Sequence, residues 1–293
     1  MRIRPATAED LTEIAALAAD AQADPARHCA YVSMPADAVA EEIGEIDDWT
    51  TGTVVAEADD ATLVAALIAE PDEDMGRVWW WGPFWAAGVE DPLRLSLDLW
   101  AAAPAQITSM PEHELCGDGR NTTVDALAAE LGFRTDEASA VLTFEITDGL
   151  PAPAVAPSVR EMTAEDGPAV AALHELHFAG SHLPADQAGS VGDERIRLVA
   201  VGADGGVAAY AIAELQADGG GYLDFLGTHL DAQGRGHGTD LVAACVAEFA
   251  RRGCRNAHLT VRESNTAARR VYEKAGFTEE RLLRPRRRGF ALG

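Results

Sequence analysis

The sequence predicts an α/β (α+β) protein built from two copies of one domain, each with a mixed central sheet flanked by helices. Apolar runs typical of strands alternate with segments of helical periodicity. A proline-rich stretch, Thr147–Pro157, interrupts this pattern near the middle of the chain. Segments on either side of it resemble one another. Because 293 residues exceed the usual size of one domain, we expect domains at 1–148 and 158–293, joined by a linker at 149–157.

The repeat has two anchors. Ile3–Asp10 (IRPATAED) is echoed by Val159–Asp166 (VREMTAED) at a spacing of 156 residues. Each copy predicts a short strand, a turn with helix-capping character and an amphipathic helix. Further on, Asn121 precedes a Gly-Phe pair by the same distance as Asn265 does, and these copies are 144 residues apart. The anchors indicate duplication of one domain, with about 12 net residues inserted in the first copy.

The second half has a clear succession of elements. We expect strands, from their alternation and glycine-containing turns, at Ser158–Met162, Ile196–Val201, Val207–Leu215, Gly221–Thr228 and Ala257–Arg262. We expect helices, from apolar residues at helical spacing, at Asp166–Phe178, Gly236–Arg252 and Thr266–Ala275. A central strand-loop-helix-strand-helix unit follows from this order.

The net charge and the cysteines limit the classes of protein that this sequence can belong to. The net charge of −25, from 48 acidic and 23 basic residues, repels phosphate backbones and anionic lipids, so we expect neither nucleic acid nor membrane as a partner. Such a surface serves solubility, or it attracts a cationic amine substrate. The four cysteines form no CxxC pair, the first residues hold no apolar signal segment, and no run of 18 apolar residues occurs. We therefore expect a reduced, cytoplasmic protein, monomeric or homodimeric, without a metal.

The strongest motif is a glycine-rich loop, Gln233–Gly238 (QGRGHG), between a predicted strand and a predicted helix. Glycine allows close approach of the backbone to an anion, and the N–H groups and dipole at a helix start bind phosphate. The spacing fits neither a Rossmann fingerprint nor a loop ending in Lys-Ser/Thr. A turn that merely joins strand to helix is the alternative.

Two motifs together resemble the GNAT superfamily of N-acetyltransferases. Gln233–Gly238 is similar to the pyrophosphate loop of that family, and Asn265–Phe277 is similar to its second signature, in the family's order. The resemblance extends from Val155 to about Arg284 and is weak in the first half. It implies that acetyl-CoA binds where two parallel strands, Gly221–Thr228 and Ala257–Arg262, splay apart.

The resemblance also implies roles for individual residues toward the cofactor. Backbone groups of Leu226, Gly227 and Thr228 would hold the pantetheine arm and polarise the thioester carbonyl. The diphosphate would lie on Gln233, Gly234, Arg235, Gly236, His237, Gly238 and Thr239. Asn265 and Arg269 would contact the far side of the cofactor.

Proton transfer needs an acid and a base. Tyr272 matches the position of the family's usual general acid, and a phenol suits protonation of a departing thiolate; a packed aromatic is the alternative. Tyr222 stands where many members carry a glutamate. Asp224, two residues on and therefore on the same strand face, is our candidate base. Glu214, His229 or a chain of waters are alternatives.

Three histidines lie in and after the first helix of the second half: His174, His177 and His182. The family often recognises its acceptor in this region. Surface or packing roles are the alternative, and the three form no metal set with cysteine spacing.

The first half lacks the corresponding chemistry. A spacing of 144 places the loop on Val89–Arg94, which has no glycine, one proline and two carboxylates, and it places Tyr272 on Ala128. We therefore expect a degenerate first copy. Its aromatic run, Trp79–Trp85, is either a buried strand whose aromatic side chains pack on the partner domain or an aromatic wall facing an acceptor site.

The combined expectation is an acyltransferase that moves an acetyl group from acetyl-CoA to a small, aminoglycoside-like or peptidyl amine by direct attack. One alternative is an acyl-CoA-binding regulatory or scaffold protein without turnover. Another is mycothiol synthase, whose architecture also joins a degenerate copy to an active one, although Tyr222 replaces the acidic residue expected there. A third alternative is an acyltransferase that uses an acyl-CoA donor other than acetyl-CoA.

Overall fold

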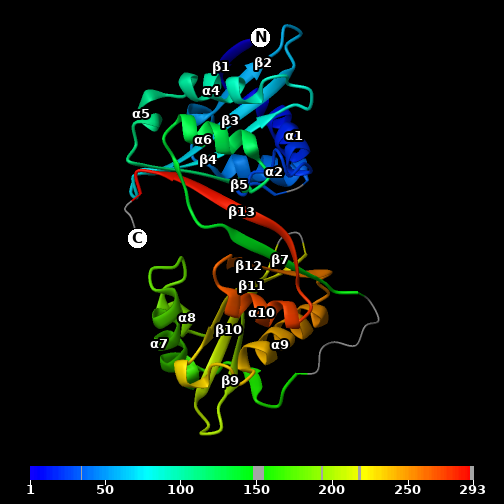
Figure 1. The fold of residues 1–293 in the computed structure, drawn as a ribbon, viewed down its shortest axis with the longest axis vertical. Helices are drawn as coiled ribbons and strands as arrows, with labels where there is room; N and C mark the ends of the chain where they lie inside the picture. The colour runs from blue at the N-terminus through cyan, green and yellow to red at the C-terminus, as the bar shows by residue number, and fades with distance from the viewer. Residues whose placement is uncertain (34, 148–154, 193, 217–218, 291–293) are drawn as a thin grey trace. The chain divides into compact units, whose positions relative to one another are not determined.

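The computed structural model describes residues 1–33, 35–147, 155–192, 194–216 and 219–290 (Figure 1). The chain divides into two compact units. The first unit comprises Met1–Ser139 and Arg281–Gly293, and the second comprises Ala140–Glu280. Most of the expected linker lies outside the described residues. The units differ from a division at that linker because each takes a short segment from the other half of the sequence.

The first unit is a mixed sheet with helices on its faces. Its strands are β1 (Arg2–Pro5), β2 (Val54–Glu57), β3 (Leu63–Asp72), β4 (Arg77–Trp85), β5 (Glu112–Asp118) and β6 (Arg134–Thr135). Its helices are α1 (Leu11–Gln22), α2 (Ala36–Glu45), α3 (Trp49–Gly52), α4 (Pro92–Ala102), α5 (Ala105–Thr108) and α6 (Thr122–Glu130). The sheet order is β1-β2-β3-β4-β5-β13, with β4 and β5 parallel.

The second unit repeats this plan. Its strands are β7 (Ser139–Glu145), β8 (Val159–Glu161), β9 (Ile196–Val201), β10 (Val207–Leu215), β11 (Gly221–Thr228), β12 (Asn256–Arg262) and the start of β13 (Thr278–Arg288). Its helices are α7 (Gly167–Phe178), α8 (Ala185–Ala188), α9 (His237–Arg251) and α10 (Thr266–Lys274). The order is β13-β7-β12-β11-β10-β9-β8, and β11 and β12 are parallel. The expected tandem α/β fold is confirmed.

The two units have the same helix-capping interactions at equivalent positions. In the first unit, Thr7 and Asp10 form a capping box, and Arg4 binds Asp10 at 2.7 Å. Thr163, Asp166 and Arg160 do the same in the second unit, also at 2.7 Å. The side chains of Asn121 and Asn265 each accept a hydrogen bond from the backbone N–H three residues on, as helix N-caps do. The insertion in the first copy lies between α1 and β2, where α2 and α3 occur.

The last strand completes the first unit. Leu283–Arg288 pair antiparallel with β5, and Arg286 and Arg287 also pair with β6. Arg286 is fully buried, and its Nε and Nη2 donate to Asp125 Oδ1 of α6 at 3.0 and 2.7 Å. A strand distant in sequence is therefore an interior strand of the first unit's sheet.

In the second unit, helices cover both faces of the sheet. Helix α7 packs on β10 and β11, whereas α9 packs on β9, β10 and β11 from the other side (Figure 1). The core on the α7 face includes Leu173, Tyr210, Ile212 and Phe225. No helix in the described part of the chain is long and apolar enough to cross a membrane.

Candidate active site

Strands β11 and β12 separate soon after they begin. Their parallel ladder holds only two pairs, Gly221 with Ala257 and Tyr222 with His258. By contrast, β10 pairs with the other edge of β11 as far as Thr228. Among the described residues, the edge of β11 that faces β12 therefore has no ladder partner beyond Tyr222. A gap between two strands with free backbone groups is the arrangement that the family resemblance implied.

A β-bulge interrupts β11 inside this gap. Leu223 pairs with Ala213 and Phe225 pairs with Ile212, so Asp224 has no partner in the β10 ladder. Bulges bend a strand and re-aim its side chains. Before the bulge, a Cβ on Gly221 would overlap Phe249 of α9.

After the bulge, the alternation is reversed. A Cβ on Gly227 would overlap Tyr210, on the α7 face, while Leu226 and Thr228 lie next to Gly238 at the start of α9. Glycine is therefore needed at 227. The backbone of Leu226–Thr228 lies where strand β11 leads to the glycine-rich loop.

The glycine-rich loop ends in an open helix start. Gly234 and Gly236 have φ values of 75° and 94°, which favour glycine, and nothing lies within 4 Å of a Cβ at either position. Gly236 is the N-cap of α9, and no side chain accepts a hydrogen bond from the first turn of this fully described helix. The first N–H groups of a 15-residue helix thus remain available to an anion.

The remaining loop residues surround this helix start. Gln233 and Arg235 are exposed, and His237, Gly238 and Thr239 are half-buried at the first turn of α9. The Nδ1 of His237 is buried without a hydrogen-bond partner among the described residues. Positive-φ glycines, uncapped N–H groups and an orphaned nitrogen fit a diphosphate, so the residues present suit the CoA donor.

Two residues expected to contact the far side of the cofactor have partners within the unit. The Asn265 side-chain oxygen accepts from the Ala268 N–H at 3.1 Å and caps α10. The guanidinium of Arg269 binds Glu279 at 2.7 Å. Each therefore has a structural role in this structure, independent of any ligand.

Tyr272 lies on α10 and is buried, with 7% of its surface exposed. Burial, together with the neighbouring Cys245 and Tyr222 groups, raises the pKa of its phenol well above the ordinary value. Burial raises the pKa of Tyr222, whereas the nearby Thr260 side chain of β12 lowers it. Tyr222, which contributes to raising the pKa of Tyr272, is the last residue of β11 that pairs with β12. Tyr272 is therefore associated with the point where the two strands separate.

Asp224 projects on the opposite side of the sheet from α9. Its Oδ2 accepts from His182 Nε2 at 3.1 Å. Burial raises the pKa of Asp224, and Glu214 raises it further, whereas His182 and Arg195 lower it. The Asp224 carboxylate contributes to raising the pKa of Tyr222, which lies two residues earlier on β11 where the two strands separate.

The three histidines of the α7 region separate into three roles. His174 is 1% exposed and binds the Tyr210 hydroxyl through Nδ1 and the Leu183 carbonyl through Nε2, both at 2.8 Å. His177 is exposed and lies 2.8 Å from the carbonyl oxygen of Thr228. His182 binds Asp224. The sequence indicated that the three histidines lie in one region. Only the fold shows that His174 is buried and holds neighbouring groups, whereas His182 binds a carboxylate.

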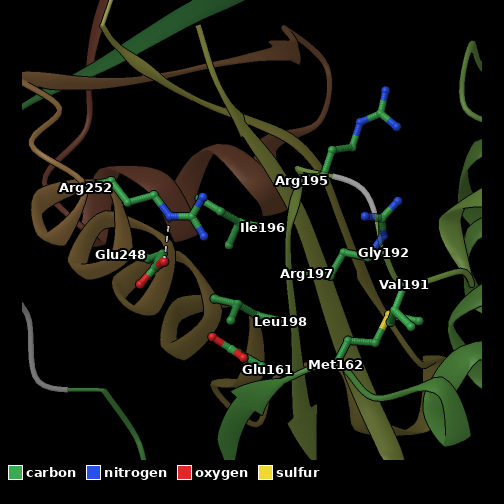
Figure 2. A pocket seen from close by; sticks show the side chains of 10 residues that line it. All are labelled: Glu161, Met162, Val191, Gly192, Arg195, Ile196, Arg197, Leu198, Glu248 and Arg252. Carbon is green, nitrogen blue, oxygen red and sulfur yellow. Dashed lines mark hydrogen bonds and ion pairs between the residues drawn. The ribbon is translucent and has the colours of Figure 1, made fainter.

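A separate cavity of about 180 Å³ lies beside the far end of α9 (Figure 2). Its lining includes Glu161, Arg197 and Arg252, and Arg252 Nε binds Glu248 at 2.7 Å. The glycine-rich loop, Asp224 and Tyr272 do not line it. Among the described residues, no group of three or more histidine, cysteine, aspartate or glutamate side chains could hold a metal ion.

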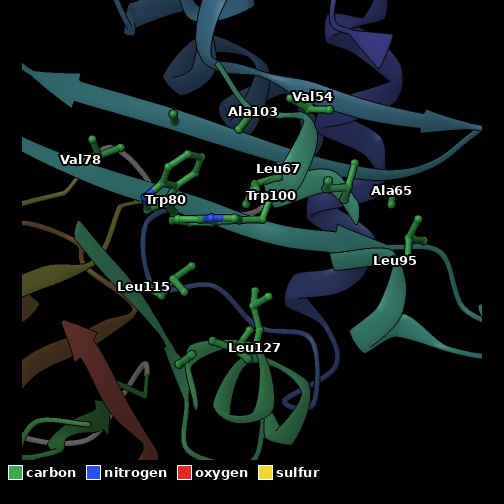
Figure 3. Packing of buried hydrophobic residues seen from close by; sticks show 14 of the residues in the cluster. Val54, Ala65, Leu67, Val78, Trp80, Leu95, Trp100, Ala103, Leu115 and Leu127 are labelled. Atoms are coloured by element: carbon green, nitrogen blue, oxygen red, sulfur yellow. The ribbon is translucent and has the colours of Figure 1, made fainter. Parts of the chain in front are cut away.

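The aromatic run of the first unit belongs to its own core. Trp80 is fully buried and packs against Trp100 with ring centroids 4.3 Å apart (Figure 3). Trp81, Phe84 and Trp85 are also buried. These side chains lie in two apolar clusters on the faces of the sheet. The run is therefore a buried strand, as expected, but these four side chains pack in the clusters of their own unit and not on the partner domain; buried rings cannot form an exposed wall.

The first unit also has strands that stop pairing. The β4 and β5 ladder runs from Arg77–Glu112 to Trp80–Leu115 and ends there, although both strands continue. The residues Arg27–Ala30 of the inserted region lie across this point. Gln22 holds the segment by accepting from the Cys29 N–H and donating to the Cys29 carbonyl, both at 2.8 Å.

The segment Arg27–Ala30 binds both strands of the first unit beyond their last pair. Toward β4, Arg27 donates to the Trp85 carbonyl at 3.0 Å, and Cys29 Sγ accepts from the Gly82 N–H at 3.3 Å. Toward β5, the Ala30 N–H donates to the Cys116 carbonyl at 2.9 Å. The chain itself thus occupies, in the first unit, the gap that is open in the second.

The loop equivalent differs as expected. Helix α4 begins at Pro92 and is capped by Asp91, whose carboxylate accepts from the Arg94 N–H at 3.0 Å. A helix start that already holds a carboxylate, in place of uncapped N–H groups after glycines, is poorly suited to a diphosphate. Ala128, in the position of Tyr272, is buried in the core.

Comparison with known proteins identifies the fold of the chain and the family of one domain in its second half. The acetyltransferase (GNAT) family model matches residues 161–277. A GCN5-related N-acetyltransferase from Sphaerobacter thermophilus has a similar structure, with a TM-score of 0.73 and 22% identity, over 99% of this chain and 97% of that one. A tandem GNAT protein from the clavulanic acid biosynthesis pathway aligns with a TM-score of 0.64 and 16% identity, over 100% and 99% of the two chains.

A GNAT-family acetyltransferase from Colwellia psychrerythraea aligns over 98% of this chain and 100% of that one, with a TM-score of 0.57 and 11% identity. The comparison with curated proteins finds no match. At these identities the solved structures show the fold alone, whereas the family model identifies the domain that contains the open strand gap and the glycine-rich loop. The chain therefore carries an acetyltransferase domain of the GNAT family in its C-terminal half, within a tandem GNAT fold.

Proposed function

We propose that the second unit transfers an acetyl group from acetyl-CoA to a primary amine by direct attack. The observation that carries the proposal is the gap between β11 and β12, which leads to positive-φ glycines and an uncapped helix start. A thioester donor supplies an activated carbonyl and a thiolate leaving group. A strand gap for the arm and N–H groups for the diphosphate suit such a donor.

The donor-binding roles follow from position. The backbone of Leu226–Thr228 would hold the arm and direct an N–H at the thioester carbonyl. The loop Gln233–Thr239 would hold the diphosphate, with Arg235 adding positive charge on an acidic protein. The amide nitrogen of Asn265 is the group left to the cofactor, because its oxygen caps α10.

Tyr272 is the proposed proton donor to the leaving sulfur. Burial raises its pKa, so the phenol holds its proton throughout the neutral range and can donate it only as negative charge develops on sulfur. Its electrostatic coupling to Tyr222 associates it with the strand separation. Asp224 supplies the carboxylate that assists loss of the acceptor's proton.

The first unit is proposed to bind no acyl-CoA. Its strand gap is filled by Arg27–Ala30, and its helix start is capped by Asp91. A ligand arm there would have to displace several hydrogen bonds made by the chain itself, including the contact of Arg27 with Trp85.

The proposal is tested by two measurements on the full chain. Calorimetry with acetyl-CoA should detect binding, and release of the CoA thiol should depend on an amine drawn from spermidine, kanamycin and a lysine-containing peptide. Binding without thiol release for any amine would favour a CoA-binding regulatory protein. Absence of binding at millimolar acetyl-CoA would refute the assignment of the loop.

A further inference from the structure

We infer that His182 takes the proton from the acceptor ammonium and that Asp224 positions its imidazole for this task. The inference deepens the proposed transfer reaction and rests on it. It adds a catalytic residue that the sequence alone left among surface or packing histidines. In this arrangement His182 reaches the acceptor, whereas Asp224 acts on the acceptor only through His182.

The exposure of the two side chains decides which of them meets the acceptor. The Asp224 side chain is 10% exposed, whereas that of His182 is 66% exposed. The carboxylate lies beneath the imidazole, with Nε2 and Oδ2 3.1 Å apart. An acceptor that approaches from solvent therefore touches His182 first, while Asp224 acts through the hydrogen bond.

The direction of that hydrogen bond sets the tautomer. A carboxylate only accepts, so Nε2 carries the proton and Nδ1 keeps its lone pair. No hydrogen bond to Nδ1 of His182 occurs among the described residues. The ring also packs near Phe225, with centroids 5.2 Å apart. The basic nitrogen is therefore the one directed away from Asp224.

The backbone on both sides of His182 is held by a buried histidine. His174 Nε2 donates to the Leu183 carbonyl at 2.8 Å and lies 3.1 Å from Ser181 Oγ. Burial lowers the pKa of His174, which keeps it neutral, so its Nδ1 accepts from the Tyr210 hydroxyl. Ser181 and Leu183 flank His182, and their anchoring fixes where the exposed imidazole stands.

Titratable groups around the pair come from β10, from β11 itself and from the residue before β9. Glu214 of β10 and Arg195, just before β9, lie 3.6 Å apart and affect Asp224 in opposite directions. The Asp224 carboxylate also contributes to raising the pKa of Tyr210 on β10 and of Tyr222 on β11. Burial and Glu214 raise the pKa of Asp224, whereas His182 and Arg195 lower it.

The proton balance of the reaction closes with these residues. His182 Nδ1 removes one proton from R–NH3⁺, and the neutral amine nitrogen bonds to the thioester carbonyl carbon. The C–S bond breaks, its electron pair goes to sulfur, and Tyr272 donates its proton there. The second proton of the attacking nitrogen returns to Tyr272 through water, and His182 releases its proton to solvent, so one proton is liberated per amide formed.

Chemical rescue tests the inference, because an exposed base leaves room for a free one. His182→Ala should turn over spermidine, kanamycin or the lysine peptide, whichever the wild type uses, about 10²-fold more slowly. Added imidazole should restore a substantial part of that loss. Tyr272→Phe, which lacks the acid, should not respond to imidazole. Asp224→Asn should lower kcat, and Asp186→Asn, an exposed carboxylate on α8, should not.

Calorimetry and urea unfolding accompany the kinetics. His182→Ala should bind acetyl-CoA as the wild type does and unfold at a similar urea concentration. Undiminished turnover in His182→Ala, or a loss that imidazole does not restore, would overturn the inference. Loss of turnover on replacing His229 or Glu214, with His182→Ala active, would assign the base elsewhere. A wild type that never releases thiol would instead refute the proposed transfer reaction.

Discussion

A single methyl group on Gly236 should weaken acetyl-CoA binding. Gly236 has a φ of 94° and a ψ of −10° as the N-cap of α9, and nothing lies within 4 Å of an added Cβ. The methyl group therefore has room, and the cost of Gly236→Ala is backbone strain alone. The left-handed conformation costs an L-residue about 1–2 kcal/mol.

The strain should appear in the binding free energy. Without ligand, the loop of Gly236→Ala can relax and turn the first N–H groups of α9 out of line. Binding of the diphosphate must then restore the strained conformation. At about 1.4 kcal/mol per tenfold, the dissociation constant should rise roughly 5- to 30-fold. Isothermal titration calorimetry with acetyl-CoA measures this change directly.

Gly205→Ala is the matched control. Gly205 also has a positive φ, 83°, and nothing within 4 Å of its Cβ, but it lies in the turn between β9 and β10. It should lose similar stability in urea unfolding while its acetyl-CoA affinity stays unchanged. Equal weakening of binding in both variants, or none in Gly236→Ala, would refute the assignment of Gln233–Thr239 as the diphosphate-binding loop.

Three further outcomes are expected. Tyr272→Phe should lower turnover by about 10²-fold or more with unchanged acetyl-CoA affinity, as measured by steady-state kinetics and calorimetry; normal turnover would exclude it as the proton donor. Calorimetry on the full chain should give one acetyl-CoA site, because Arg27–Ala30 fill the gap of the first unit; two equivalent sites would contradict this. Asp125→Ala should lower the free energy of unfolding by about 3 kcal/mol, because fully buried Arg286 loses its partner; the figure is at the low end for such pairs since Asp125 is 34% exposed. Asp98→Ala, which breaks an exposed pair, should cost less than about 1 kcal/mol, and equal losses in urea unfolding would argue against a buried-charge effect.

Local patterns predicted the elements of the second unit well. Strands β9, β10 and β11 have the bounds expected from alternation and from the glycine turns between them. Helix α9 begins one residue after the expected start, since Gly236 is its cap. The spacing of 144 residues also places β12 on β5 and α10 on α6. These features depend on neighbours in sequence, so a single sequence contains them.

The features that the sequence did not reveal depend on distant contacts. His182 and Asp224 are 42 residues apart, and no local pattern pairs them. The bulge at Asp224 appears only in its register against β10. Asn265 illustrates another limit, because the same asparagine caps a helix in both copies, so its presence in a motif does not separate structure from ligand binding.

The position of Leu283–Arg288 within the first unit has a consequence for how the chain folds. A ribosome makes these residues only after the whole of the second unit, yet they form an interior strand between β5 and β6. Until they emerge, the edge of β5 and the Asp125 carboxylate lack their partners. The N-terminal unit therefore stays incomplete until the second unit has been made, and a gene cut at the proline-rich linker would encode two fragments that each lack a strand.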